Sequence, residues 1–206
     1  DILLKKYKPQ FPIHQLGQDG SDRVYFRIGN KPHTEIVMKY GHEKEENSFY
    51  AHISLFLKKL NLPVPDILEI HSKKGIILIE DLTDMSLCHA FSEKSHDYVL
   101  ALYKIILSHI AQLHKNGHSL WQKNPFHICA PFTYKTYRWE SQYFKENFLQ
   151  EIANIEFSDS LEKIWENDCD YLATLLSQEK TVLIHRDLQS KNIMIKNDKP
   201  YLYGSK

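Results

Sequence analysis

The sequence predicts an α+β protein with two lobes, in which a β-rich first part precedes a mainly helical second part. Short runs of alternating apolar residues fill most of the first part, and a single helical pattern interrupts them. From Asp97 onward, apolar residues instead recur at helical spacing in three long segments. The two parts meet near the segment IEDLTDMS, so we expect one lobe at residues 1–81 and the other at residues 82–206.

The first lobe is expected to contain an antiparallel sheet. Turn residues between Gly17 and Asp22 precede alternating Val24, Phe26 and Ile28, a pattern that predicts a β-hairpin with a small polar tip. Further strands are predicted at TEIVMKY (34–40), DILEI (66–70) and GIILIEDL (75–82), with the turn HSKKG between the last two.

One helix is expected within this lobe, in the segment HEKEENSFYAHISLFLKKLNLPVP (42–65). Glu46, Phe49 and Ile53 recur at helical spacing, and Pro63 and Pro65 prevent the helix from continuing. The acidic residues at its beginning are typical of the first turn of a helix. We therefore predict an amphipathic helix that starts with acidic residues.

The second lobe is expected to be helical. A first helix begins near Asp97, is predicted to be buried on most sides, and ends at Gly117 as its C-cap. Two more helices are predicted at PFTYKTYRWESQYFKENFL (131–149) and SDSLEKIWENDCDYLATLLSQ (158–178), the latter capped by Ser158 or Ser160. The aromatic residues of TYRWESQYF are interpreted as core rather than as the lining of a substrate pocket.

Composition excludes several classes of function. The 26 basic and 26 acidic residues balance, so no overall field attracts the chain to nucleic acid or to an anionic membrane. No apolar run reaches the length of about 18 residues that a spanning helix needs, and the cytoplasm is the expected compartment. The oligomeric state is not indicated by any pattern.

Neither the cysteines nor the histidines predict a metal site. The three cysteines, Cys88, Cys129 and Cys169, are widely spaced and are expected to be reduced thiols. His114 and His118 have the i, i+4 spacing of zinc ligands, but no glutamate completes a metalloprotease motif.

The segment TVLIHRDLQSKNIMIKNDKPYLYGSK at the end of the chain carries the strongest functional signal. Asp187 follows the β-rich run 182–184, and Asn192 opens a second such run five residues later. Phosphoryl transfer from a nucleotide needs a carboxylate that orients the attacking hydroxyl, oxygen ligands for Mg²⁺ and a cation on the phosphates. Asp187 and Asn192 meet the first two needs, although a polar turn between two strands has a similar composition.

This segment resembles the catalytic loop of the aminoglycoside phosphotransferase and choline kinase-like family, whose members are related to protein kinases. LGQDGSDRVYFRI, the strand IVMKY, LPVPDILEI, GIILIEDL and YRWESQYF occur in the order and spacing of its bacterial small-molecule kinases, including those of cell-wall amino sugars. The similarity runs from Gln15 onward, but only the catalytic-loop motif is specific. It implies a two-lobed protein-kinase-like fold with nucleotide bound between the lobes.

The resemblance assigns roles within the catalytic loop. Asp187 corresponds to the catalytic base, Asn192 to a magnesium ligand, and His185 to a residue that anchors the loop, with Arg186 between the histidine and the base. Gln189 matches a polar position near the substrate.

The resemblance also places a nucleotide site in the first lobe. Gly20 and Ser21, in the hairpin tip GQDGSD, correspond to a loop that covers the phosphates, although the kinase spacing of glycines is absent and an ordinary tight turn is the alternative. Lys39 matches the strand lysine that holds the α- and β-phosphates, with Glu46 as its expected carboxylate partner. The alternative for Lys39 is a solvated edge residue.

The resemblance further implies a hinge between the lobes at Glu80, Asp81 and Leu82, whose backbone would bind the adenine edge. We thus expect ATP and Mg²⁺ as cofactors and transfer of the γ-phosphate to a hydroxyl of a small molecule, with a sugar or amino sugar as the favoured acceptor. Phosphorylation of an aminoglycoside, or nucleotide binding without turnover as in a pseudokinase, are the alternatives.

The resemblance breaks at Gly204, which stands where the family has a metal-binding aspartate. Either the chain is part of a longer enzyme with an incomplete second lobe, or it lacks a principal metal ligand. We favour the first explanation as the expectation.

Overall fold

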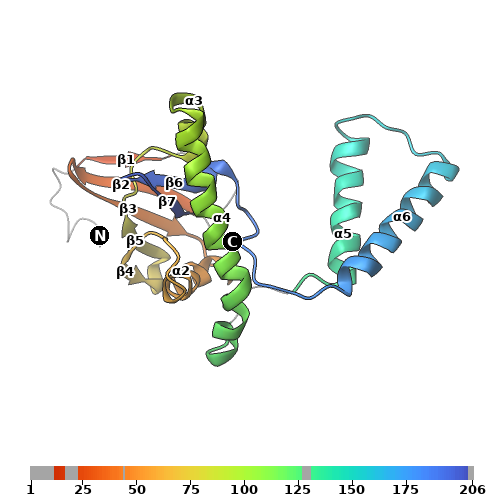
Figure 1. Ribbon diagram of the computed structural model, residues 1–206, viewed down its shortest axis with the longest axis horizontal. Helices are drawn as coiled ribbons and strands as arrows, with labels where there is room; N and C mark the ends of the chain where they lie inside the picture. The colour runs from red at the N-terminus through yellow and green to blue at the C-terminus, as the bar shows by residue number, and fades with distance from the viewer. Residues whose placement is uncertain (1–11, 17–22, 44, 127–130, 204–206) are drawn as a thin grey trace. The chain divides into compact units, whose positions relative to one another are not determined.

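The computed structural model describes residues 12–16, 23–43, 45–126 and 131–203. The chain divides into two compact units, a larger unit of residues 1–128 with 183–206 and a helical unit of residues 129–182. Figure 1 labels their helices and strands. The lobe boundary that we expect after residue 81 lies inside the larger unit.

A five-stranded antiparallel sheet forms the first part of the larger unit, with the strand order β1-β2-β3-β5-β4. The strands are β1 (Ile13–Gln15), β2 (Arg23–Asn30), β3 (His33–Tyr40), β4 (Ile67–His71) and β5 (Ile76–Glu80). They confirm the expected sheet, and the antiparallel pairing of β1 with β2 confirms the hairpin. The hairpin tip at residues 17–22 lies outside the described residues.

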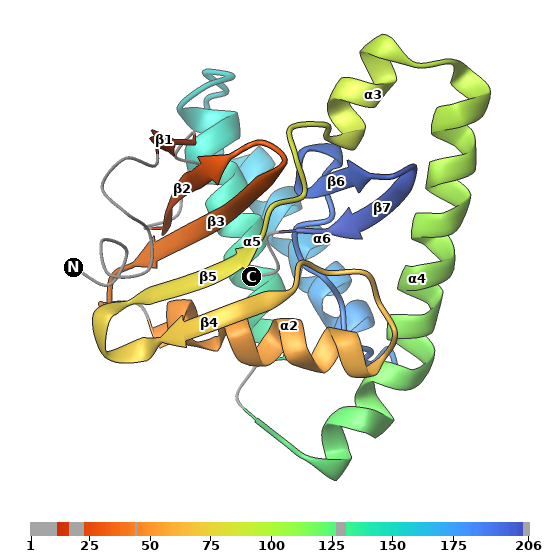
Figure 2. The ribbon, with the colours of Figure 1, turned by 90° about the vertical axis from the view of Figure 1, so that its left-hand side faces the viewer.

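Helix α2 (Tyr50–Lys59) packs along one face of this sheet, as Figure 2 shows. It begins later than predicted, because the 3₁₀ helix η1 (Glu45–Phe49) holds the acidic residues and the first turn of α2 contains none. The first two residues of α2, Tyr50 and Ala51, are buried in a cluster with the sheet. Packing, rather than the acidic run, therefore sets the beginning of this helix.

The two faces of the sheet carry separate sets of buried residues, because successive side chains of a strand point to opposite faces. Ile36, Met38 and Tyr40 of β3 pack with Tyr50 of α2, and we call this the α2 face. Val37 packs on the opposite side with neighbouring strands, and we call this the outer face; its cluster contains Ile28, Val37 and Leu78.

The second part of the larger unit contains the short helix α3 (Leu87–Glu93), the long helix α4 (His96–Lys123) and the hairpin β6 (Ile193–Lys196) and β7 (Lys199–Leu202). The hairpin confirms the β-rich run that begins after Asn192, and its two-residue turn has positive φ angles of 52° at Asn197 and 59° at Asp198. The sequence reading did not predict α3, whose Leu87 and Ala90 pack with α4 and β6.

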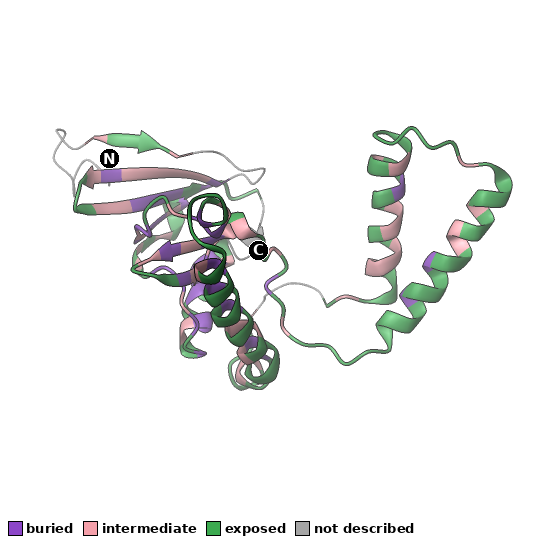
Figure 3. Cartoon of the chain, turned by 45° about the horizontal axis from the view of Figure 1, so that its top comes forward, coloured by how far each residue is buried: buried purple, intermediate pink, exposed green. Residues whose placement is uncertain are grey.

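Helix α4 differs from its prediction in two ways. Gly117 is not a C-cap, because the helix continues to Lys123. The helix is also buried along one face only, since its buried residues are Val99, Leu102, Ile106, Leu113 and Gly117 while Leu107 is 62% exposed. Figure 3 shows this exposure along α4.

The segment that leads into the catalytic loop is not a strand. Residues 182–184, predicted as a β-rich run, have no regular secondary structure. Leu183 instead packs against α4, where a Cβ on Gly117 would lie 3.1 Å from its Cδ1 atom. The glycine allows the chain to pass close to the helix, so side-chain packing rather than strand pairing holds the start of the loop.

The helical unit contains α5 (Tyr134–Phe144), a π-helical turn (Lys145–Gln150) and α6 (Asp159–Ser177). Both helices were predicted, and Ser158 rather than Ser160 caps α6 by accepting a hydrogen bond from the amide of Leu161. The interpretation of the aromatic stripe as core is wrong for this structure, since α5 has no buried residue and Trp139 is 60% exposed.

Among the helices of the described segments, none is both long enough and apolar enough to cross a membrane.

Candidate active site

Hydrogen bonds within the loop bring Asp187 and Asn192 together. The side-chain amide of Asn192 donates to the backbone carbonyl of Asp187 at 3.0 Å, and the Asn192 backbone amide donates to the Gln189 carbonyl at 2.9 Å. Nε2 of Gln189 donates to Oδ1 of Asp187 at 2.6 Å. Hydrogen bonds among its own residues therefore fix the shape of the loop from Asp187 to Asn192.

The orientation of Asn192 fits a role as a metal ligand. Because its amide nitrogen donates to Asp187, its Oδ1 atom is the acceptor that remains for a cation, and Mg²⁺ prefers oxygen ligands. Within the ranges that the structure describes, no group of three or more His, Cys, Asp or Glu side chains has metal-binding geometry. A Mg²⁺ ion held by Asn192 would need phosphate oxygens as further ligands, since Mg²⁺ in nucleotide enzymes binds through one or two protein groups together with phosphates.

His185 lies beneath the loop with only 6% of its surface exposed. Neither ring nitrogen has a hydrogen-bond partner among the described groups. Burial lowers the pKa of the imidazole, and the nearby Asp187 opposes this only in part. Its burial fits the predicted anchoring role, and the next residue, Arg186, takes a left-handed backbone conformation with φ of 66° that turns the chain toward Asp187.

Tyr203 joins the catalytic loop to the α2 face of the sheet. Its backbone amide donates to the carbonyl of Asn192 at 2.9 Å. Its ring lies against the buried cluster of the α2 face, with its centroid 5.7 Å from that of Tyr25. Burial raises the pKa of the Tyr203 phenol, and Tyr25 and Tyr50 add to this effect. The α2 face is thus the side of the sheet that meets the end of the catalytic loop.

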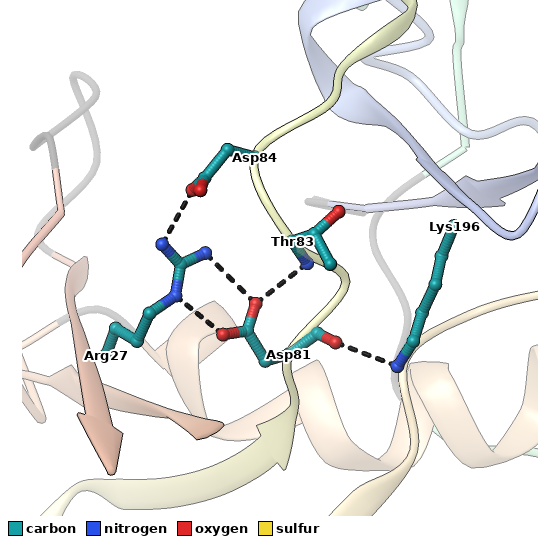
Figure 4. A network of polar contacts seen from close by, with 5 residues as sticks. All are labelled: Arg27, Asp81, Thr83, Asp84 and Lys196. Atoms are coloured by element: carbon teal, nitrogen blue, oxygen red, sulfur yellow. Dashed lines mark hydrogen bonds and ion pairs between the residues drawn. The ribbon is translucent and has the colours of Figure 1, made fainter. Parts of the chain in front are cut away.

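The expected hinge is held by an ion-pair network, shown in Figure 4. Arg27 of β2 donates from Nε and Nη2 to the two carboxylate oxygens of Asp81, at 2.6 and 3.0 Å, and from Nη1 to Asp84 at 2.6 Å. The amide of Thr83 donates to Asp81 at 2.8 Å. Burial alone would raise the pKa of Asp81, but hydrogen bonds from Arg27, Thr34 and Thr83 outweigh it and lower the pKa.

Lys196, the last residue of β6, contacts the hinge from the other side. Its ammonium donates to the carboxylate of Glu80 at 2.7 Å and to the backbone carbonyl of Asp81 at 2.9 Å. One of the backbone groups expected to face adenine is therefore occupied by a side chain, while Leu82 is buried with 3% exposure. Backbone binding of adenine at this hinge stays a prediction.

The structure describes only some of the residues that we predict to contact phosphate. Lys39 lies in β3 and is exposed; because its side chain alternates with those of Met38 and Tyr40, it projects from the outer face. Gly20, Ser21 and Gly204, and the side chain of Glu46, lie outside the described residues. The structure therefore brings together Asp187, Gln189 and Asn192 in the loop, and Glu80 and Asp81 at the hinge, while Lys39 is in neither group.

Four polar residues around the site were not singled out from the sequence: Arg23, Arg27, Asn47 and Lys196. Arg23 and Arg27 share the α2 face of β2, because they lie four residues apart on one strand. Two charged residues at even spacing in an otherwise apolar strand are the signal that could have identified them. No local pattern indicates that Asn47 and Lys196 pair with residues far away in the sequence.

Comparison with known proteins identifies a family for this chain. A family model described as "Phosphotransferase enzyme family" matches residues 12–203. Among curated proteins, the chain is 22% identical over 200 residues to N-acetylmuramate/N-acetylglucosamine kinase of Pseudomonas aeruginosa. That alignment covers 93% of this chain and 54% of the relative, so the chain spans about half the length of the relative.

Solved structures show the fold at low sequence identity. The streptomycin–ATP–APH(2")-IIa ternary complex matches with a TM-score of 0.61 at 14% identity, over 98% of this chain and 68% of the other. Choline kinase LicA from Streptococcus pneumoniae matches with a TM-score of 0.60 at 14% identity, over 98% and 66% of the two chains. By its family match the chain belongs to the phosphotransferase enzyme family, and its fold is protein-kinase-like.

Proposed function

We propose that this chain carries the nucleotide-binding and catalytic-loop parts of a kinase that transfers the γ-phosphate of ATP to a hydroxyl of a small molecule. The arrangement of Asp187 and Asn192 is the observation that carries the proposal: the side chain of one is hydrogen-bonded to the backbone of the other at 3.0 Å. Residues 1–81 would bind the nucleotide, and residues 82–206 would supply the loop.

Asp187 would act on the acceptor hydroxyl. Its carboxylate orients the hydroxyl and accepts its proton as the oxygen attacks the γ-phosphorus atom and the bond to ADP breaks. Gln189 donates to one oxygen of this carboxylate at 2.6 Å and so helps to orient the group. This positioning of the reacting groups is the main contribution that a protein makes to phosphoryl transfer.

Asn192 would hold Mg²⁺ through its Oδ1 atom, together with phosphate oxygens of the nucleotide. When bound, the cation offsets negative charge on the phosphates. The amide fits this role because the donation from its nitrogen to Asp187 fixes which end of the side chain faces the cation.

A sugar or amino sugar is the acceptor that we favour. The support is the similarity to the N-acetylmuramate/N-acetylglucosamine kinase, which extends over 93% of this chain. Both compounds in that name are N-acetylated sugars, so an uncharged ring hydroxyl next to an acetamido group is the class of acceptor to test first.

A cationic acceptor such as an aminoglycoside is a second candidate. The observation that favours it is a hollow of about 460 Å³ along α6 in the helical unit, lined by Glu166, Asn167, Asp170, Tyr171 and Thr174. Two of these residues are acidic, although Glu166 pairs with Arg138 and Asp170 accepts a hydrogen bond from Tyr134.

A product assay tests the proposal. The purified chain is incubated with MgATP and, separately, with N-acetylglucosamine, N-acetylmuramate, streptomycin or choline, and the acceptors are analysed by mass spectrometry. We expect a gain of one phosphate on an N-acetylated sugar. A gain on streptomycin alone would favour the second candidate, and MgATP binding without a phosphorylated product would support a pseudokinase.

A further inference from the structure

We propose that Arg23 is the cation that binds the nucleotide phosphates from the sheet, a role that the family resemblance assigns to Lys39. This inference rests on the proposed function, since it assigns a residue to the nucleotide site of that function. It follows from the face of the sheet on which each side chain lies, the way Arg23 is held, and the contact of that face with the catalytic loop.

Strand register separates the two cations. Arg23 of β2 lies directly opposite Tyr40 of β3, and Lys39 lies opposite Val24. Residues directly opposite each other in an antiparallel pair share a face. Since Tyr40 belongs to the buried cluster with α2, Arg23 is on the α2 face and Lys39 is on the outer face.

Arg23 is held in place from the segment that begins α2. Its Nε donates to Oδ1 of Asn47 at 3.1 Å, and its guanidinium lies 5.5 Å from the centre of the Tyr50 ring. Asn47 is itself fixed by donation to the carbonyl of Gly41 at 3.3 Å. With only 5% of its surface exposed, Arg23 is a fixed cation rather than a solvated surface residue.

Among the described residues, the two side chains that hold Arg23 are neutral. An amide oxygen and an aromatic ring orient a guanidinium, but neither supplies the negative charge that compensates for a buried cation. Because the Nε group of Arg23 donates to Asn47, the Nη1 and Nη2 groups are the guanidinium donors that can face an anion. Two such donors match the geometry of phosphate oxygens.

The α2 face is also the side that reaches the catalytic loop. The Tyr50 ring beneath Arg23 and the Tyr203 ring belong to the same cluster, and the backbone of Tyr203 bonds to Asn192. The face that carries Arg23 is therefore the one joined to the loop that we propose to hold the metal.

Nucleotide binding by charge-removal variants tests this assignment. Arg23→Met keeps an apolar stem over Tyr50 but removes the fork, Lys39→Met removes the competing cation, and Lys73→Met is the matched control in the exposed turn before β5. MgATP and adenosine affinities are measured by calorimetry, after circular dichroism and thermal unfolding show that each variant is folded.

We expect Arg23→Met to weaken MgATP binding by about tenfold or more, because it removes charge-assisted hydrogen bonds to phosphate. Adenosine binding should stay within about twofold of wild type, since adenosine lacks phosphate. Lys39→Met should lose less MgATP affinity than Arg23→Met, and Lys73→Met should lose none. Arg23→Lys, which keeps the charge but not the fork, should fall between Arg23→Met and wild type.

Three results would overturn the assignment: unchanged MgATP affinity in Arg23→Met, an equal loss of MgATP and adenosine binding in that variant, or a larger loss in Lys39→Met. The second result would show that Arg23 only maintains the fold. If the wild-type chain binds neither MgATP nor adenosine, the proposed function fails and this assignment fails with it. If the wild-type chain binds MgATP and Arg23→Met binds it equally well, only the assignment of Arg23 fails.

Discussion

Arg27 and Asp81 form a two-point ion pair in which Nε and Nη2 of the arginine donate to the two carboxylate oxygens at 2.6 and 3.0 Å. The pair joins β2, the second strand of the sheet, to the segment after β5 where the hinge is expected. Both side chains are largely buried, with exposures of 14% and 6%. The strand that leads from the hairpin tip is thus fixed relative to the hinge.

Removal of the Asp81 carboxylate should destabilise the protein. We expect Asp81→Asn to lower the free energy of unfolding by about 3 kcal/mol, because the change leaves a mostly buried guanidinium without its main partner. Urea denaturation followed by circular dichroism measures the difference.

Asp84→Asn is the matched control for this prediction. It removes the other carboxylate that Arg27 contacts, but that side chain is 68% exposed. An exposed ion pair is worth at most about 1 kcal/mol, so the control should lose far less stability than Asp81→Asn. Equal losses of unfolding free energy in the two variants would show that the buried ion pair stabilises the protein no more than the exposed one.

The sequence predicted the elements that depend on local patterns. Alternating apolar residues located β2, short β-rich runs located β3, β4 and β5, and helical spacing located α4, α5 and α6. The catalytic-loop motif identified Asp187 and Asn192, which the structure brings together. These features are encoded within a few residues of each other, so a linear pattern is enough to find them.

Features that depend on long-range packing were missed. Gly117 resembled a C-cap because glycine commonly ends helices, but here it lies inside α4 and gives Leu183 room to approach. The face of Lys39 follows from where α2 packs, and the pairing of Lys196 with the hinge joins residues more than a hundred positions apart. Neither relationship is visible in a short stretch of sequence.

The close approach at Gly117 yields a second prediction. A Cβ at this position would lie 3.1 Å from Cδ1 of Leu183 and 3.2 Å from Cδ1 of Leu113. Gly117→Val should therefore overpack the contact and lower the free energy of unfolding by about 1–3 kcal/mol.

Asn116→Val, at the neighbouring exposed position of α4, is the control, because valine and asparagine have similar helix propensities and the change should be nearly neutral. Thermal unfolding of the two variants compares the effects. If Gly117→Val is no less stable than Asn116→Val, Leu183 does not pack against the helix as described.

Burial of His185 predicts a pH dependence of stability. Because burial lowers its pKa below the ordinary value of 6.5, the unfolded chain takes up a proton as pH falls through 6.5 while the folded chain does not. The contribution of His185 to stability is therefore complete above pH 6.5 and is lost as pH falls toward the lowered pKa.

Melting temperatures of wild type and His185→Gln between about pH 7.5 and 5 measure this contribution. The variant is expected to be less stable than wild type at pH 7.5, with a smaller difference at pH 5. A difference that does not change with pH would contradict burial of a neutral imidazole.

The central claim is that the loop from His185 to Asn192 catalyses phosphoryl transfer, and the turnover of Asp187→Ala tests it most directly. The rate of phosphate transfer from MgATP to the acceptor identified for the wild-type chain is compared with the affinity of each protein for MgATP. The account predicts a rate at least about a hundredfold lower in the variant, with MgATP affinity nearly unchanged. A variant that turns over at the wild-type rate would contradict it.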